Sequence, residues 1–183
     1  MNDWSDQKLL RAYAGEKSEA AFAELVRRHL DFVYSAALRM IRDSEPARDV
    51  TQSVFMALAR EASKVANHRT VAGWLHRTAR NLASTTVRAD VRRRAREQEV
   101  VAMNDNATHG TTALWNEIAP QLDEALENLR EPDREALLLR YFQNKNIREV
   151  AAVLATSEDA AQKRVNRALE RLRSLMARRG VTA

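Results

Sequence analysis

Glycine and proline are scarce in this chain, with 4 Gly and 3 Pro among 183 residues. Strand-rich folds need many tight turns, and tight turns draw on these two residues. Apolar side chains also recur at steps of three and four residues, most clearly over residues 19–41. This spacing is typical of one face of an amphipathic helix. The sequence therefore predicts an all-α fold.

Capping residues and apolar stripes locate the individual helices of the first half. We expect four of them, over residues 6–14, residues 19–41, residues 43–62, and from a cap at Thr70 to about residue 96. Between the last two, residues 63–69 are polar and lack helical periodicity, which predicts an irregular loop.

A stretch without periodicity or large apolar side chains, residues 104–112, predicts a flexible linker between two helical halves. The predicted division is a first small helical domain over 1–97, an acidic linker over 98–117 and a second small helical domain over 118–183. The second domain is expected to hold four short helices. Its last helix should open at Thr156, where a hydroxyl and an acid three residues later resemble a capping box.

Charge is distributed unevenly although the net charge is only +5. Residues 69–96 carry 8 Arg and one Asp, and residues 160–179 carry 7 basic side chains and one Glu. Between them, residues 97–133 carry 9 acids and one Arg. Two Arg-rich blocks on separate helices suit phosphate neutralisation, because guanidinium binds phosphate in a bidentate manner. Solvated helix faces with a compositional bias toward Arg are the other interpretation.

Several classes of protein fit the composition poorly. The chain has no Cys, which excludes disulfides, thiolate metal sites and a cysteine nucleophile. The four His residues lack metal-ligand spacing, and no glycine-rich phosphate loop is present. No apolar run is long enough to span a membrane, and the first ten residues lack the apolar core of a signal peptide. We expect a cytoplasmic protein that is not an enzyme, with no cofactor, no metal and no membrane insertion.

The last two helices of the second half are joined by a turn near Ala155, and the second of them is rich in Arg. This pattern is typical of a helix-turn-helix, and a plain helical hairpin with a polar face is the alternative. The side chains expected to point outward from the last helix are Gln162, Lys163, Asn166, Arg167 and Glu170. The first four have the donors and acceptors that base edges require.

The order of these motifs resembles a known family. Residues 126–142 (LENLREPDREALLLRYF), 147–151 (IREVA) and 157–169 (SEDAAQKRVNRAL) resemble region four of bacterial sigma-70-type factors. Residues 43–55 (DSEPARDVTQSVF) and 73–81 (GWLHRTARN) are similar to region two. The resemblance spans about residues 20–176, and the chain length matches the extracytoplasmic-function (ECF) subgroup, which keeps only these two domains.

The resemblance implies partners and residue roles. A sigma factor binds core RNA polymerase and promoter DNA, and ECF members are often held by an anti-sigma factor. Three residues match positions that dock on the polymerase clamp: Asp49, Gln52 and Phe55. The alternative interpretation is that Asp49 is only a solvated acid on the helix surface and that Phe55 belongs to the core.

The resemblance also implies a set of DNA-binding residues. The loop around Asn67, His68 and Arg69 matches the segment that captures a flipped base of the minus-ten element. Four residues match family positions that lie along the separated DNA strand and the upstream duplex: Arg77, Arg80, Asn81 and Arg88. The recognition helix would read the minus-thirty-five element through Gln162, Lys163, Arg164, Asn166 and Arg167.

Three departures from the family pattern alter these expectations. Ser53 stands where an acid is common, which would re-tune docking on the clamp. Ala155 stands where the turn usually has Gly, so we expect the turn to take another shape, because positive φ is costly for Ala. Gln162 and Lys163 replace a frequent Lys-Ser pair, so the promoter sequence does not follow. The alternative function is a helix-turn-helix DNA-binding regulator that acts without polymerase core.

Overall fold

The computed structural model describes residues 4–98, 118 and 121–181, with the side chains of 94–98 left out. Over these residues the chain forms helices and no strand, which confirms the predicted all-α class. The first half contains α1 (Asp6–Glu16), α2 (Glu19–Ile41), α3 (Ser44–Val65) and α4 (Val71–Gln98). The second half contains a helical turn over 121–127, then α6 (Glu131–Leu137), a π-helical segment (Leu138–Phe142), α7 (Ile147–Val153) and α8 (Glu158–Ala177).

Short polar side chains begin the helices of the first half, as the sequence predicts. Ser18 accepts a hydrogen bond from the Ala21 N–H at the start of α2, and Asp43 accepts one from the Glu45 N–H at the start of α3. Thr70 does the same for the Gly73 N–H at the start of α4. Each bond satisfies a backbone donor that the first helical turn leaves without an intrahelical partner.

Two predicted boundaries are wrong. Residues 63–65 continue α3 and are not irregular, because Val65 is fully buried and the last turn of α3 packs with the core. The cap of α8 is Ser157, whose Oγ accepts from the Ala160 N–H at 3.2 Å, and not Thr156. The true capping box lies one helix earlier, where Asn146 and Glu149 exchange side-chain-to-backbone hydrogen bonds at the start of α7. α8 is also 20 residues long, which is longer than expected.

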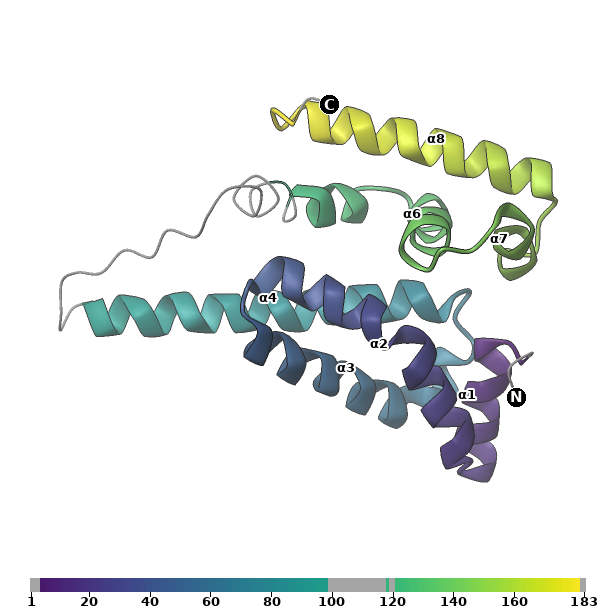
Figure 1. The fold of residues 1–183 in the computed structure, drawn as a ribbon, viewed down its shortest axis with the longest axis horizontal. Helices are drawn as coiled ribbons and strands as arrows, with labels where there is room; N and C mark the ends of the chain where they lie inside the picture. Colours follow the sequence, from purple (N-terminus) through teal and green to yellow (C-terminus); the bar gives the residue numbers. More distant parts are fainter. Residues whose placement is uncertain (1–3, 99–117, 119–120, 182–183) are drawn as a thin grey trace.

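The two halves form layers (Figure 1). α2, α3 and α4 pack on one another, α1 closes one end of this group, and α6, α7 and α8 lie above α4 in the view shown. Leu25, Leu58 and Leu75 are fully buried in the lower layer. Leu137 and Val165 are buried in the upper layer. Of the predicted linker, residues 99–117 lie outside the described part of the chain, so its flexibility remains a prediction.

A polar chain ties α1 to both layers. The Asp6 carboxylate lies 2.8 Å from His29 Nε2, and the Gln143 amide of the second half lies 3.0 Å from His29 Nδ1. Arg28 reaches the other Asp6 oxygen at 3.1 Å. Burial alone would raise the pKa of Asp6, but the contacts with His29 and Arg28 outweigh burial and hold this pKa below 3.8.

The lowered pKa of Asp6 predicts how acid affects stability. Because the folded pKa lies below the unfolded value, the stabilisation is present above pH 3.8 and is lost as the pH falls through the folded pKa. Asp6→Ala is therefore expected to lower the free energy of unfolding at pH 7 by about 1.5–3 kcal/mol, with the difference from the unmodified chain shrinking at pH 3. Urea unfolding at both pH values measures this. Glu16→Ala, which removes an exposed acid of α1, should change stability by less than about 0.5 kcal/mol; an equal loss in both variants would contradict the prediction.

Candidate nucleic-acid interface

The turn between α7 and α8 adopts the shape that a glycine would take. Ala155 has φ +49°, so the expectation that Ala155 forces a different turn is wrong. The Thr156 N–H donates to the Ala151 carbonyl at 3.0 Å, which closes the end of α7 with the hydrogen bond of a Schellman motif. Leu154 and Ala161 are buried on either side of the turn. Packing and this hydrogen bond therefore hold Ala155 in a conformation that costs an L-residue about 1 kcal/mol.

α8 presents a polar face to solvent, as the sequence predicts. Ala161, Val165 and Ala168 are buried against the rest of the second half. On the outer face, the Gln162 amide donates to Asn166 Oδ1 at 2.8 Å, so the two amides are held in a fixed arrangement. The exposed side chains of this face are Gln162, Lys163, Asn166, Arg167 and Glu170.

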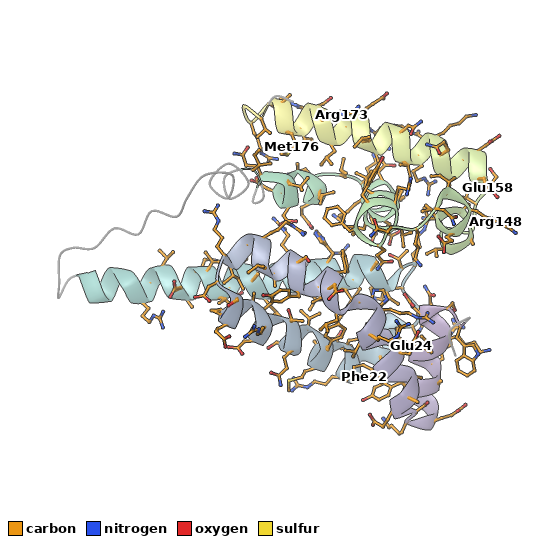
Figure 2. The ribbon with its side chains drawn as sticks, in the orientation of Figure 1. Phe22, Glu24, Arg148, Glu158, Arg173 and Met176 are labelled. Carbon is orange, nitrogen blue, oxygen red and sulfur yellow. The ribbon has the colours of Figure 1, made fainter. Side chains whose placement is uncertain are left out.

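Arg164 does not share this face. The residue is half-buried, and its NH1 nitrogen is buried without a hydrogen-bond partner. A buried guanidinium nitrogen without an acceptor is costly. Figure 2 shows the α7–α8 unit from the side, with Arg148 on α7 and Glu158 at the start of α8 at the same end.

The loop after α3 is compact and solvent-facing. Asn67 and His68 are exposed, and their hydrogen bonds return to the end of α3: the Asn67 amide donates to the Ser63 carbonyl, and the His68 N–H donates to the Val65 carbonyl. Only the backbone N–H of His68 takes part in these bonds, and its imidazole ring does not. Arg69 turns toward the second half, where its guanidinium donates to the Leu154 carbonyl at 3.3 Å.

The predicted basic positions of α4 divide into two groups. Asn81 and Arg88 are exposed, and Arg88 donates to the Ser84 carbonyl and hydroxyl within the same helix. Arg77 and Arg80 instead face the second half, where each lies beside a glutamate. The four predicted side chains therefore lie along α4. Together with Arg69, two of them make three predicted DNA-binding arginines that lie beside carboxylates of the second half.

Glu135 of α6 is the most buried of the carboxylates that meet these arginines, with 3% of the residue exposed. The Thr70 hydroxyl donates to Glu135 Oε1 at 2.8 Å, and Arg69 Nε lies 3.5 Å from Oε2. Gly73 makes room for this approach, because a Cβ at this position would lie 3.2 Å from Glu135 Oε1. Burial raises the pKa of Glu135 above 4.5, and the contacts with Thr70 and Arg69 offset only part of this increase.

A second buried contact joins the halves at Asp123. Its carboxylate receives hydrogen bonds from the Arg39 guanidinium at 3.0 and 3.3 Å, and Oδ1 lies 3.5 Å from Nε2 of the buried His76. Burial alone would raise the pKa of Asp123, but the contacts with His76 and Arg39 hold it below 3.8. The aromatic ring of Phe142 lies against Phe32, with ring centroids 6.4 Å apart.

An apolar groove of about 630 Å³ runs between α2 and α3. Leu30 and Met56 stand at its surface with 45% and 48% exposure, which is unusual for large apolar side chains in the described part of the chain. Asp49 and Gln52 are exposed on α3, and Gln52 lines the groove. Phe55 also lines it but is only 8% exposed, so its ring belongs mainly to the core and forms the floor of the groove.

Sequence reasoning missed two parts of this surface. Nothing in the helical spacing of apolar residues distinguishes Leu30 and Met56 from core residues, so only their exposure in the fold identifies the groove. The acids that meet the arginines did leave a signal, since Asp123, Glu127, Glu131 and Glu135 recur at every fourth residue. This spacing would place them on one face of a continuous helix; in the structure a break over 128–130 divides them between the segment 121–127 and α6, and they still face the first half together. Among the described residues, no group of His, Cys, Asp or Glu forms a metal site, and no helix is long and apolar enough to cross a membrane.

Comparison with known proteins identifies the family of the chain. Residues 25–94 match Sigma-70 region 2, and residues 120–172 match Sigma-70 region 4. The chain therefore belongs to the sigma-70 family. Its relatives place it among the ECF sigma factors of that family.

Two curated relatives and one solved structure illustrate the likeness. RNA polymerase sigma factor CarQ of Myxococcus xanthus is 27% identical over 163 residues, which cover 87% of this chain and 91% of CarQ. ECF RNA polymerase sigma factor SigE of Mycolicibacterium smegmatis is 29% identical over 164 residues, 85% of this chain but only 61% of SigE. CnrH, solved in complex with the cytosolic domain of CnrY, is 22% identical with a TM-score of 0.46, over 94% of this chain and 98% of CnrH.

Proposed function

We propose that this chain is an ECF-type sigma factor that binds core RNA polymerase, recognises promoter DNA and initiates transcription of a specific gene set. The observation that carries the proposal is the presence of matches to both region 2 and region 4 on one chain. In this role the chain performs no catalysis of its own and needs no cofactor. It acts in the cytoplasm, where the polymerase is.

The proposed domains are 1–97, which binds polymerase and the minus-ten element, an acidic linker over 98–117, and 118–183, which binds the minus-thirty-five element. The groove between α2 and α3, with Asp49, Gln52 and the floor residue Phe55, receives the polymerase clamp. An exposed apolar groove bordered by polar side chains is the form of many protein-binding sites.

The DNA contacts are assigned to two surfaces. On the first, Asn67, His68 and Arg69 capture a flipped base, because such a pocket needs hydrogen-bond donors, and Arg77, Arg80, Asn81 and Arg88 follow the strand. On the second, α8 enters the major groove, where Gln162, Lys163, Asn166 and Arg167 reach base edges. Arg164, on the flank of α8, meets a phosphate, which would supply the acceptor that its buried NH1 lacks.

The test of this function is transcription by core polymerase mixed with the purified chain on supercoiled promoter DNA. Promoter-specific transcripts that need both components are expected. The alternative, a helix-turn-helix regulator without polymerase, predicts tight duplex binding by the chain alone and no association with core in gel filtration. That alternative leaves the region 2 match and the apolar groove without a role. An anti-sigma factor is a further proposed partner.

Arg167 provides a prediction for the recognition helix. Because its exposed guanidinium suits bidentate contact with a guanine edge, Arg167→Ala should cost about 1–3 kcal/mol of promoter discrimination, or roughly 5- to 150-fold. Arg164→Ala should weaken promoters of all sequences uniformly, as loss of a phosphate contact does. Transcription from promoters with single-base changes in the upstream element measures both. Loss of core association in either variant would assign these residues the wrong role.

A further inference from the structure

Four acids of the second half recur at every fourth residue and meet the first half along one line. We call Asp123, Glu127, Glu131 and Glu135 the acidic row. The row starts in the helical turn over 121–127 and ends in α6, so four residues correspond to about 6 Å along each helical part. Every member of the row has a basic partner in the first half.

The partners of the row are largely residues already assigned to DNA. Arg80 NH1 lies 3.5 Å from Glu127 Oε2, and Arg77 NH2 lies 3.1 Å from Glu131 Oε1. Arg69 Nε lies 3.5 Å from Glu135 Oε2. As the residue numbers of the arginines increase, those of their glutamate partners decrease, so the two segments run in opposite directions. Three of the seven residues proposed for the first DNA surface are paired in this way.

A line of carboxylates resembles a nucleic-acid backbone in the two properties that arginine reads, charge and acceptor oxygens. A phosphate strand and the acidic row compete for the same guanidinium groups, so both cannot occupy them together. Two of the three ion pairs, those of Glu127 and Glu131, are partly exposed, and pairs of this kind contribute about 0–1 kcal/mol each. In the third, Glu135 is buried but its partner Arg69 is 44% exposed and lies 3.5 Å away. The contact is therefore weak enough to be displaced by a partner that separates the halves.

Neighbouring contacts keep the acidic row in register. Asp123 holds Arg39 at one end, Thr70 holds Glu135 at the other, and Phe142 packs against Phe32 between the layers. Gly73 lets Glu135 approach α4 closely. The arrangement is thus a fitted interface and not a chance meeting of long side chains.

We propose that the acidic row occupies the strand-binding arginines Arg69, Arg77 and Arg80 in the free protein, as an internal mimic of single-stranded DNA. The chain alone then binds DNA weakly, and separation of the halves on polymerase exposes the arginines to the promoter strand. The proposal rests on the proposed function, because that function assigns these arginines to DNA.

The test neutralises the row while keeping its shape. In the triple variant Glu127→Gln/Glu131→Gln/Glu135→Gln, each side chain retains its size and an amide oxygen that accepts a hydrogen bond. We expect the full chain without polymerase to bind a fluorescein-labelled single-stranded 20-mer at least tenfold more tightly than the unmodified chain. Three freed arginines should also steepen the dependence of log K on log salt by about 2. Fluorescence anisotropy over a salt series measures both quantities.

A matched control removes the same charge elsewhere. Glu16→Gln/Glu19→Gln/Glu61→Gln changes three exposed acids of the first half that lie outside the row. An equal gain in this control would overturn the proposal, because net charge alone would then explain it. No gain in the triple variant, with its helix content intact by circular dichroism, would overturn it as well.

Distance measurement gives a second readout that does not depend on DNA. The chain has no Cys, so spin labels at Ser63→Cys and Ser174→Cys, both exposed, report on the spacing of the halves without other changes. We expect one narrow distance distribution in the unmodified chain and a broader, longer one in the triple variant. Identical distributions in both would overturn the proposal.

Transcription with polymerase and opening of the free chain are separate properties, so each can be lost without the other. If the unmodified chain drives promoter-specific transcription with core polymerase but the triple variant neither opens nor gains DNA affinity, only the acidic-row proposal fails. If the triple variant opens and binds DNA but no transcripts form with polymerase, the proposed function fails and the internal masking of a DNA surface stands.

Discussion

Leu30→Glu is expected to weaken binding of core RNA polymerase about 30-fold or more, and to abolish transcription at ordinary concentrations. Leu30 stands at the surface of the groove between α2 and α3, whose lining is mainly apolar. A central apolar contact of this kind is worth about 2 kcal/mol or more when it is lost. Glutamate would in addition bring an unpaired charge into the desolvated interface. Met56→Glu, on the facing helix, should have a similar effect.

The fold should survive these changes because both side chains are about half exposed before binding. Val91→Glu is the matched control, since Val91 is an exposed aliphatic side chain of α4, 62% accessible and outside the groove. Co-elution with core polymerase in gel filtration, with circular dichroism of each variant, measures the outcome. If Val91→Glu lost core binding equally, or both groove variants kept it, the clamp would not dock in this groove.

The helices could be predicted from sequence because the forces that form them are local. The three-and-four spacing over 19–41 reproduces α2 (Glu19–Ile41) to the residue, and Asp43 and Thr70 begin their helices as short polar caps do. The outward face of α8 followed from the same spacing. Each of these features depends on residues within one or two helical turns.

Features that depend on distant residues were not predictable. Ala155 keeps positive φ because buried neighbours on α7 and α8 hold the turn, and the propensity of Ala alone indicated the opposite. Arg80 and Glu127 are 47 positions apart in the chain, so no local pattern announces their pairing. Phe55 looked equally suited to the core or to the surface, and the structure shows it forming the boundary between them.

Asp123→Ala is expected to separate the two halves of the free chain. Asp123 is only 2% exposed, and its carboxylate receives two hydrogen bonds from Arg39, whose side chain is itself only 10% exposed. Removing one partner of a buried ion pair leaves the other charge uncompensated, at a cost of about 3–5 kcal/mol. When the halves separate, water can solvate the Arg39 guanidinium, so opening removes the cost of a buried unpaired charge. Spin labels at Ser63→Cys and Ser174→Cys should then show the long distance.

Glu124→Ala isolates the effect of burial, because Glu124 is the neighbouring acid and pairs with Arg179 at an exposed site. Its loss should cost no more than about 1 kcal/mol and leave the halves together. Arg39→Met/Asp123→Leu removes both charges and should close the halves again, since an apolar pair of similar volume carries no desolvation penalty. If the single variant stayed closed, the buried pair would not be needed to hold the halves. The pairs of Glu127 and Glu131 contribute about 0–1 kcal/mol each, so we expect closure to require the acidic row and the Asp123 contact together, with the Phe32–Phe142 contact between the layers.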